Sequence, residues 1–329
     1  MNESKGLIDS WLMSNEIRST ITHSLKRLYE LQATFLFDQY EPVKASPPDA
    51  GIPFLRRLER WLECFSDSED QWNAYYALRY FLFVGVLETE EMYRCAVQNH
   101  LYPWLVEAAN IDIFASDVDR ILEAEMRACW PCPISDSLRI NGLLHRTNLN
   151  SQDLRPDWYS LNWLGDKSAI KKYVAKKEIR YLILFEDFVG SGTQCTRAIN
   201  FALNAFEGPV FLCPLVVCSP GDQRLRELQS SSSGRLSYSP VVVLPKNCLI
   251  QPDPSTDEPG SFAKLRVAME HGYTKYLESG APLNGGAFGF KGVGCLYGSY
   301  SNCPNNAPPI FHAYSKTWAR PLFPRRSRI

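Results

Sequence analysis

The stretch that most restricts the fold runs from an apolar strand, across a glycine-rich turn, into a helix. Residues 181–185 are all apolar or aromatic, as is typical of a central strand in a parallel sheet. Glu186 and Asp187 follow directly, and residues 190–194 read Gly-Ser-Gly-Thr-Gln. Apolar residues over 198–206 then recur at helical spacing. This order predicts a strand, a pair of acids, a tight turn and a helix.

The glycine-rich turn is typical of a loop that holds a phosphate. Its glycines let backbone N–H groups point toward one place, and the following helix start adds partial positive charge. The residues expected around a ribose 5-phosphate are Gly190, Ser191, Gly192, Thr193 and Gln194. Glu186 and Asp187 are expected to accept hydrogen bonds from ribose hydroxyls, or to hold Mg²⁺ through water.

The same turn has a simpler interpretation. Ser191 and Gln194 fit the Ser-x-x-Gln capping box, which would begin the helix without any ligand. The chain lacks the Gly-x-x-x-x-Gly-Lys loop of P-loop ATPases and the Gly-x-Gly-x-x-Gly loop of dinucleotide-binding folds. The ordered series of strand, acids, turn and helix favours ligand binding.

The pattern around this turn indicates an α/β fold with a mostly parallel sheet covered by helices. The predicted strands are 180–187, 209–218, 239–244 and 292–298. The predicted helices are 136–146, 191–206, 221–230 and 262–277.

The preceding part of the chain is predicted to be helical. Residues 6–37 show helical spacing, prolines between 42 and 53 indicate a linker, and short helices are expected over 53–65, 69–83 and 89–98. A winged-helix arrangement is one way to combine such helices. The predicted domains are an N-terminal helix (1–45), a helical or winged-helix-like domain (46–125) and an α/β domain (126–329).

Charge is distributed unevenly along the chain. Residues 1–125 contain 11 lysines and arginines against 21 acids, whereas residues 126–329 contain 24 against 15. The acidic part disfavours nucleic acid and favours docking of a protein, while the basic part suits an anionic ligand. Simple attraction between the two parts is an equally open explanation.

Neither a signal-peptide profile nor an apolar run long enough for a bilayer is present, so we expect a cytoplasmic protein without membrane contact. The ten cysteines then serve mainly as small apolar side chains. Cys129 and Cys132 have the spacing of a redox or zinc pair, but no second pair completes a zinc site.

The segment 182–192 resembles the signature of the phosphoribosyltransferase superfamily: apolar residues, two acids, a spacer and a Ser/Thr-Gly turn. The resemblance implies an α/β domain that binds phosphoribosyl pyrophosphate with Mg²⁺. Glu186 and Asp187 would lie near the ribose hydroxyls. The sequence departs from the pattern at Gln194, where Thr is usual, and at Gly190, where some purine-using members have an acid that acts as base.

Further stretches resemble one branch of this superfamily, the phosphoribosyltransferase-like proteins of bacterial conflict and antiphage systems, some linked to retrons. They are residues 133–141, residues 303–310 and the run from Trp318 to Arg325. The residues assigned to pyrophosphate are Ser135, Asp136 and Ser137 at an expected helix start, with Arg139 as a catalytic cation beside Glu186 and Asp187. Asn305 and Asn306 are candidates for the base side, although a plain turn and a plain helix cap explain these motifs as well.

Three functions follow from these observations. The first is an effector that binds phosphoribosyl pyrophosphate or a nucleotide with Mg²⁺ and acts at the ribose anomeric carbon. The second is an inactive nucleotide-sensing or assembly subunit, whose acidic half holds a partner such as a reverse transcriptase or another defence component. The third is a regulator that binds nucleic acid, directly or through a partner, using residues 50–100 and the basic stretch 171–180.

Overall fold

The computed structural model describes residues 6–13, 16–41, 51–149 and 167–325. The chain divides into two compact units, and each is described by itself. One unit contains residues 1–86 and 246–329, and the other contains residues 87–245. We call the first the split unit, because its two parts are distant in sequence, and the second the sheet unit.

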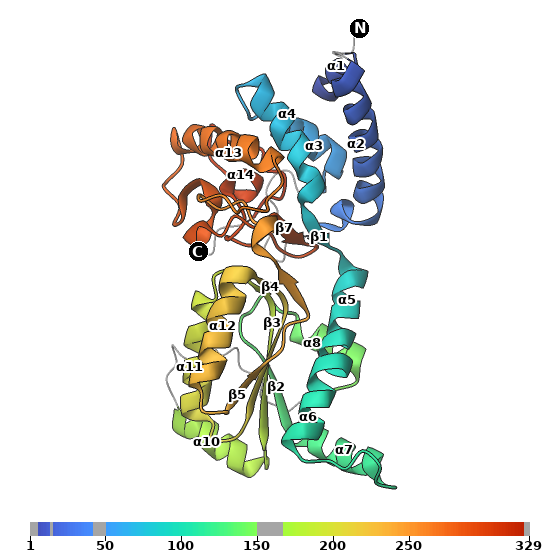
Figure 1. The fold of residues 1–329 in the computed structure, drawn as a ribbon, viewed down its shortest axis with the longest axis vertical. Helices are drawn as coiled ribbons and strands as arrows, with labels where there is room; N and C mark the ends of the chain where they lie inside the picture. Colours follow the sequence, from blue (N-terminus) through green and yellow to red (C-terminus); the bar gives the residue numbers. More distant parts are fainter. Residues whose placement is uncertain (1–5, 14–15, 42–50, 150–166, 326–329) are drawn as a thin grey trace. The chain divides into compact units, whose positions relative to one another are not determined.

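The sheet unit is built on a parallel sheet (Figure 1). Its strands are β2 (Cys129–Pro133), β3 (Tyr181–Val189), β4 (Val210–Cys218), β5 (Leu236–Tyr238) and β6 (Val242–Leu244). β3 lies between β2 and β4, and β5 and β6 pair in succession along the far side of β4. Every pairing is parallel, so the carboxyl ends of these strands meet at one edge.

Helices cover both faces of this sheet (Figure 1). On one side lie α10 (Lys167–Lys176), α11 (Thr193–Ala205) and α12 (Ser219–Ser231). On the other side the chain forms α5 (Val86–Cys95), a π-helical segment (Ala96–Leu101), α6 (Tyr102–Ala108), α7 (Val118–Arg127) and α8 (Ile140–Thr147). Leu182 and Leu184 of β3 pack under Ile199 of α11 in the core of the first side. Trp104 stacks on Phe211 with ring centroids 4.9 Å apart on the other. Burial on both faces explains why the central strands are almost wholly apolar.

The split unit combines helices from both ends of the chain. From the N-terminal part come α1 (Leu7–Leu12), α2 (Glu16–Phe35), α3 (Phe54–Leu62), α4 (Ser68–Ala77), β1 (Leu82–Val84) and two 3₁₀ turns (Phe37–Gln39 and Leu78–Tyr80). From the C-terminal part come α13 (Ser261–Leu277), β7 (Tyr297–Ser299), α14 (Pro309–His312) and three 3₁₀ turns (Lys246–Cys248, Gly286–Phe288 and Phe290–Gly292). β1 pairs in parallel with β7, and α4 packs against α13.

An aromatic core joins the two parts of the split unit. The ring of Phe323 stacks on that of Phe81 with centroids 4.7 Å apart. The indole N–H groups of Trp61 and Trp318 both donate to the Ile310 carbonyl, at 2.7 Å and 3.0 Å. These rings are almost fully buried, so a polar end of each indole needs such a partner. The motif-like residues between 303 and 325 therefore have a packing role in this unit.

The predicted α/β class with a mostly parallel sheet is confirmed. The strands expected at 180–187 and 209–218 correspond to β3 and β4, whereas the strand expected at 239–244 is divided between β5 and β6. The helix expected over 69–83 ends at Ala77, because the chain turns there to pair β1 with β7. The strand expected over 292–298 shortens to β7, because glycines with positive φ at 292 and 294 precede it.

The predicted domain boundaries differ from the two compact units. The units divide after residues 86 and 245, whereas the predictions placed boundaries after 45 and 125. A winged-helix arrangement of residues 46–125 is not confirmed, since α3 and α4 pack in the split unit while α5 to α7 cover the sheet. Most of the predicted proline linker, residues 42–50, lies outside the described residues. No helix in the described ranges is both long and apolar enough to cross a membrane.

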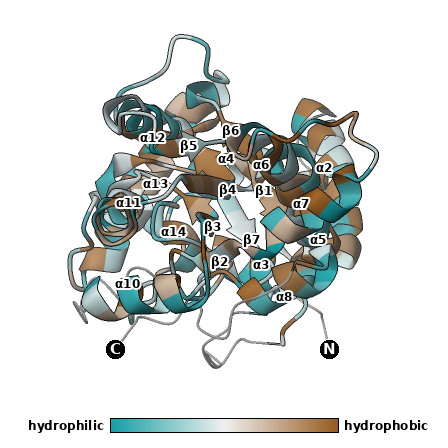
Figure 2. Cartoon of the chain, turned by 90° about the horizontal axis from the view of Figure 1, so that it is seen from below, coloured by the Kyte–Doolittle hydropathy of each residue, from teal (hydrophilic) through white to brown (hydrophobic). Residues whose placement is uncertain are grey.

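Hydropathy follows this architecture (Figure 2). α12 shows mostly hydrophilic colours because only its inner residues face the sheet, with Gly221 and Leu225 buried. A helix of this kind owes its position to a narrow apolar face. Gly221 on this inner face lets α12 approach the backbone of its neighbours closely.

The aromatic core provides the first prediction. A Cβ atom at Gly272 of α13 would lie 2.9 Å from Ile310 Cγ2 and 3.0 Å from Trp318 Cη2. We expect Gly272→Ala to lower the free energy of unfolding by about 1–3 kcal/mol through overpacking, measured by urea denaturation with tryptophan fluorescence. Gly260→Ala is the control, since a Cβ there meets no atom within 4 Å. Equal stability of the two variants would contradict the packing described.

Candidate ligand-binding site

The predicted acid pair lies at the carboxyl edge of the sheet. Register places Pro133 of β2 beside Phe185 of β3, and the Ile134 amide donates to the Phe185 carbonyl at 2.9 Å. The loop that follows β2 therefore runs beside Glu186 and Asp187. Ligands of open parallel sheets bind at this edge, beyond the carboxyl ends of the strands.

Two serines of the β2–α8 loop hold the two acids. The Ser135 backbone N–H donates to Glu186 Oε2 at 3.0 Å, and the Ser137 hydroxyl donates to Asp187 Oδ1 at 2.8 Å. The serine hydroxyl oxygens lie 2.7 Å apart. Glu186 is only 5% exposed, so this amide contact offsets part of the cost of burying its carboxylate. The structure thus brings together the acids and two of the three residues assigned to pyrophosphate.

The environment of Asp187 shifts its ionisation. Burial raises the pKa of this carboxyl above its ordinary value, and the hydrogen bond from Ser137 offsets only part of that rise. Burial also raises the pKa of the nearby Cys195 thiol, and the charge of Glu186 adds to the rise. Cys195 therefore stays a protonated thiol, whereas Asp187 would become easier to ionise if a cation or hydroxyl donors approached it.

The glycine-rich turn presents unpaired amides. Within the described part of the chain, and apart from regular helix and strand bonds, no acceptor is found for the backbone N–H groups of residues 191–194. Gly192 is buried, and buried backbone donors in native proteins nearly always have a partner. The helix dipole of α11, which begins at Thr193, adds partial positive charge at the same place. A bound anion would satisfy these donors.

The capping-box interpretation of this turn is wrong. α11 begins at Thr193 after Gly192, which has φ 74° and no side-chain cap. Ser191 Oγ instead lies 3.2 Å from Thr193 Oγ1. Because Gly192 is in the left-handed region, Ser191 is one residue too early to cap the helix.

The start of α12 closes against the turn, which the sequence did not indicate. A Cβ at Gly221 would lie 2.6 Å from the Gly190 carbonyl oxygen, so only glycine allows this approach. One helical turn later, Arg224 Nη1 donates to Thr193 Oγ1 at 3.2 Å. The available signal was topological: the helix after β4 must begin beside the loop after its neighbour β3.

Other predicted site residues lie in different surroundings. Ser135, Asp136 and Ser137 lie in a loop, not at a helix start as expected, because α8 begins only at Ile140. Arg139 is exposed at the residue before that helix. The pyrophosphate-binding roles assigned to these residues stay predictions.

Asn305 and Asn306 belong to the split unit, whereas Glu186 and Asp187 belong to the sheet unit. Asn306 is buried, and its Nδ2 donates to the Phe290 carbonyl at 3.0 Å. Asn305 is exposed, and its carbonyl accepts from the Phe290 amide at 2.7 Å. These contacts hold a glycine-rich loop in place. Their assignment to the base side stays a prediction.

The Cys129–Cys132 pair is not arranged as a redox or zinc pair in this fold. Both residues are buried in β2, where residues three apart point to opposite faces of the sheet. Burial raises the pKa of Cys129 to about 12, which keeps it protonated. No group of three or more metal-ligating side chains occurs among the described residues.

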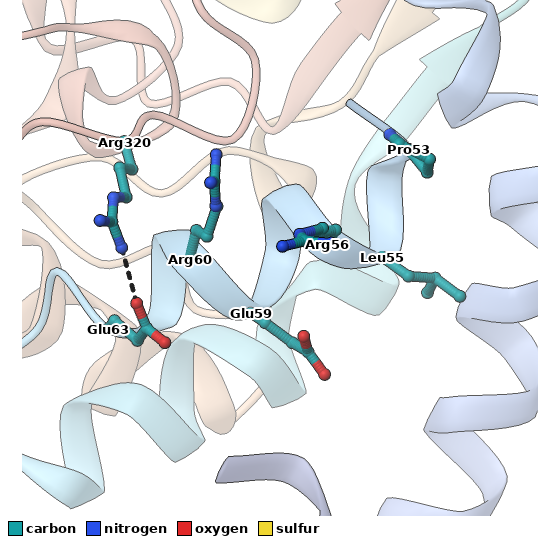
Figure 3. Close-up of a pocket in the computed structure, with 7 residues that line it drawn as sticks. All are labelled: Pro53, Leu55, Arg56, Glu59, Arg60, Glu63 and Arg320. Carbon is teal, nitrogen blue, oxygen red and sulfur yellow. Dashed lines mark hydrogen bonds and ion pairs between the residues drawn. The ribbon is translucent and has the colours of Figure 1, made fainter. Parts of the chain in front are cut away.

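A surface cavity on the split unit contains none of the predicted site residues (Figure 3). It has a volume of about 550 Å³ and is lined by Pro53, Leu55, Arg56, Glu59, Arg60, Glu63 and Arg320. Arg320 Nη1 pairs with Glu63 Oε2 at 2.8 Å across its wall. Its acids and arginines nearly balance, so the lining carries no strong preference for an anion.

Comparison with known proteins gives one family. The PRTase-CE family model matches residues 58–325, which is most of the chain. The match includes the acid pair, the glycine-rich turn and the aromatic segment 303–325. No curated protein matches the chain.

The raised pKa of Asp187 predicts a pH-dependent stability difference. The Asp187 carboxyl binds its proton more tightly in the folded protein than in the unfolded chain. The folded protein therefore loses stability as pH rises from about 4 through the raised pKa of this group. Asn cannot ionise, so we expect Asp187→Asn to melt at a higher temperature than wild type at pH 7. That gain should vanish below pH 4, where both forms are neutral.

Thermal denaturation followed by circular dichroism between pH 3.5 and 8 measures this difference. The exposed loop residue Asp253 supplies a control, Asp253→Asn, for which no gain is expected. A melting temperature of Asp187→Asn below that of wild type at pH 7 would show that the carboxylate is well solvated.

Proposed function

The chain belongs to the PRTase-CE family, and on that premise we propose that its sheet unit binds phosphoribosyl pyrophosphate, or a related nucleotide, together with Mg²⁺. The proposed activity makes or breaks a bond at the ribose anomeric carbon. The observation that carries the proposal is the set of amides at residues 191–194 without an acceptor among the described residues, a short distance along the chain from the buried Glu186 and the half-buried Asp187.

The unpaired amides support a 5-phosphate at the glycine-rich turn. A phosphate monoester offers three strongly accepting oxygens and nearly two negative charges at neutral pH. The amides between Gly190 and Gln194 supply donors without bulky side chains, and α11 supplies its positive end. A ribose bound in this way would extend its hydroxyls toward the end of β3.

The acid pair supports contacts to the ribose and to Mg²⁺. Glu186 and Asp187 each accept a hydrogen bond from a serine of the β2–α8 loop, which places both carboxylates at the end of β3. Mg²⁺ in nucleotide sites is usually held by one or two carboxylates, waters and substrate phosphates rather than by a full protein cage. Among the described residues no third metal-ligating side chain joins these two acids, an arrangement that fits this mode. The ion would neutralise charge on the pyrophosphate.

The proposed chemistry rests on positioning and charge. The bond between the anomeric carbon and a pyrophosphate oxygen breaks, its electron pair leaves with the pyrophosphate, and an acceptor atom bonds to the carbon. Glu186 and Asp187 would steady the positive ribose that develops, while Ser135 to Ser137 and Arg139 would contact the departing pyrophosphate. Burial of Glu186 keeps water away from one side of this charge.

Calorimetry with phosphoribosyl pyrophosphate and Mg²⁺ tests the binding. We expect wild type to bind and Asp187→Asn to bind about tenfold more weakly, because a charged hydrogen-bond acceptor is replaced by a neutral one. Asp253→Asn should retain wild-type affinity. No heat from wild type at millimolar ligand would reject the proposal, and an unchanged affinity of Asp187→Asn would reject the role of that acid.

A nucleotide-sensing subunit without turnover is the second candidate. It is favoured by Gly190, which is buried and offers no proton acceptor where related purine-using enzymes place an acid. Release of pyrophosphate, followed by ³¹P NMR with purine and pyrimidine acceptors, separates the two. Turnover abolished by Asp187→Asn identifies the enzyme, whereas binding without pyrophosphate release identifies the sensor.

An effector role in bacterial antiphage defence is part of the same proposal. Its support is the resemblance of residues 133–141 and 303–325 to conflict-system proteins, both of which lie within the family match. The acidic surface of residues 1–125 would hold a defence partner such as a reverse transcriptase. Plaque counts on a host carrying the gene with its neighbours, compared with the Asp187→Asn gene, measure this role; equal counts would reject it.

A further inference from the structure

Arg224 places a cation directly on the glycine-rich turn. This exposed residue of α12 donates from Nη1 to Thr193 Oγ1 at 3.2 Å. Its Cδ atom lies 3.1 Å from the position that a Cβ on Gly192 would take. Thr193 Oγ1 is in turn 3.2 Å from Ser191 Oγ. Two hydroxyls and a guanidinium therefore converge beside the unpaired amides.

We propose that Arg224 is a ligand-binding residue that makes the site selective for the doubly charged phosphate of a sugar phosphate over the uncharged sugar. The inference rests on the proposed function and deepens it, because it assigns the charge recognition to a helix outside the turn. Arg224 is a specificity-determining residue and takes no part in bond breaking.

The charge distribution around the turn favours such a cation. Residues 186–196 contain two acids and no lysine or arginine. Glu186 and Asp187 repel an approaching anion, and amide dipoles alone supply only partial charges. A guanidinium offers a full charge and several donors in a planar fork that matches phosphate oxygens. Arg197 follows on α11, but among the described contacts it is Arg224 whose guanidinium reaches a side chain of the turn.

Packing of α12 fixes where this cation stands. The close approach of Gly221 to the Gly190 carbonyl sets the first turn of the helix against the loop. Residue 224 then lies about one turn further along the same face. The other arginine of this helix stretch, Arg226, is held by Asp222 at 2.9 Å and lies over the Tyr238 ring. Arg226 therefore supplies a control arginine on the same helix, because its contacts are with Asp222 and Tyr238.

The test uses the full chain and ribose 5-phosphate, which carries the 5-phosphate without a pyrophosphate. We expect Arg224→Gln to bind ribose 5-phosphate about tenfold more weakly than wild type at low salt, since a charge-assisted contact is lost. Its affinity should also depend less on ionic strength, because one charge fewer faces the anion. Arg224→Lys should recover part of the affinity, and Arg226→Gln should behave like wild type.

The outcomes separate this inference from the proposed function. If wild type binds ribose 5-phosphate and Arg224→Gln binds with the same affinity and salt dependence, Arg224 is an ordinary surface residue and the inference is overturned. An equal loss in Arg226→Gln also overturns it, because general surface charge then explains the effect. If wild type binds neither ribose 5-phosphate nor phosphoribosyl pyrophosphate, the proposed function itself is rejected.

Discussion

A hydrogen bond from the Ser135 amide to the buried Glu186 carboxylate joins the ends of two adjacent strands, and the candidate site depends on it. A buried carboxylate is costly unless donors face it. β2 and β3 are parallel and in register up to Pro133 and Phe185, so the loop after β2 can supply those donors. The pairing of strands thereby determines which loop stands beside the acids.

The turn after the acids presents backbone groups more than side chains. Its buried glycines leave amides without acceptors, and Gly221 lets α12 approach until Arg224 reaches Thr193. Small residues on two elements allow contact that any Cβ would prevent. The acids at the end of β3 and the amides and guanidinium at the turn therefore place groups of opposite charge close together at one edge of the sheet.

The split unit depends on a different kind of interaction. Its two parts are about 160 residues apart in the chain, and aromatic rings hold them together around Phe323 and Trp61. The shared Ile310 carbonyl, which accepts from two indoles, shows how such a core keeps its polar groups paired. The family match includes these residues.

The sequence by itself determined the local elements of the site. The apolar run at 181–185, the acids that follow it and the glycines at 190 and 192 predict strand, turn and helix, because these preferences arise from near neighbours. It could not show that Ser135 faces Glu186, that Ser191 fails to cap α11, or that Arg224 reaches the turn. Those contacts depend on strand order and on glycine packing between distant segments, which only the tertiary structure decides. The pairing of β1 with β7 could not be predicted from sequence either, because each strand is only three residues long and too short to show an alternating hydrophobic pattern.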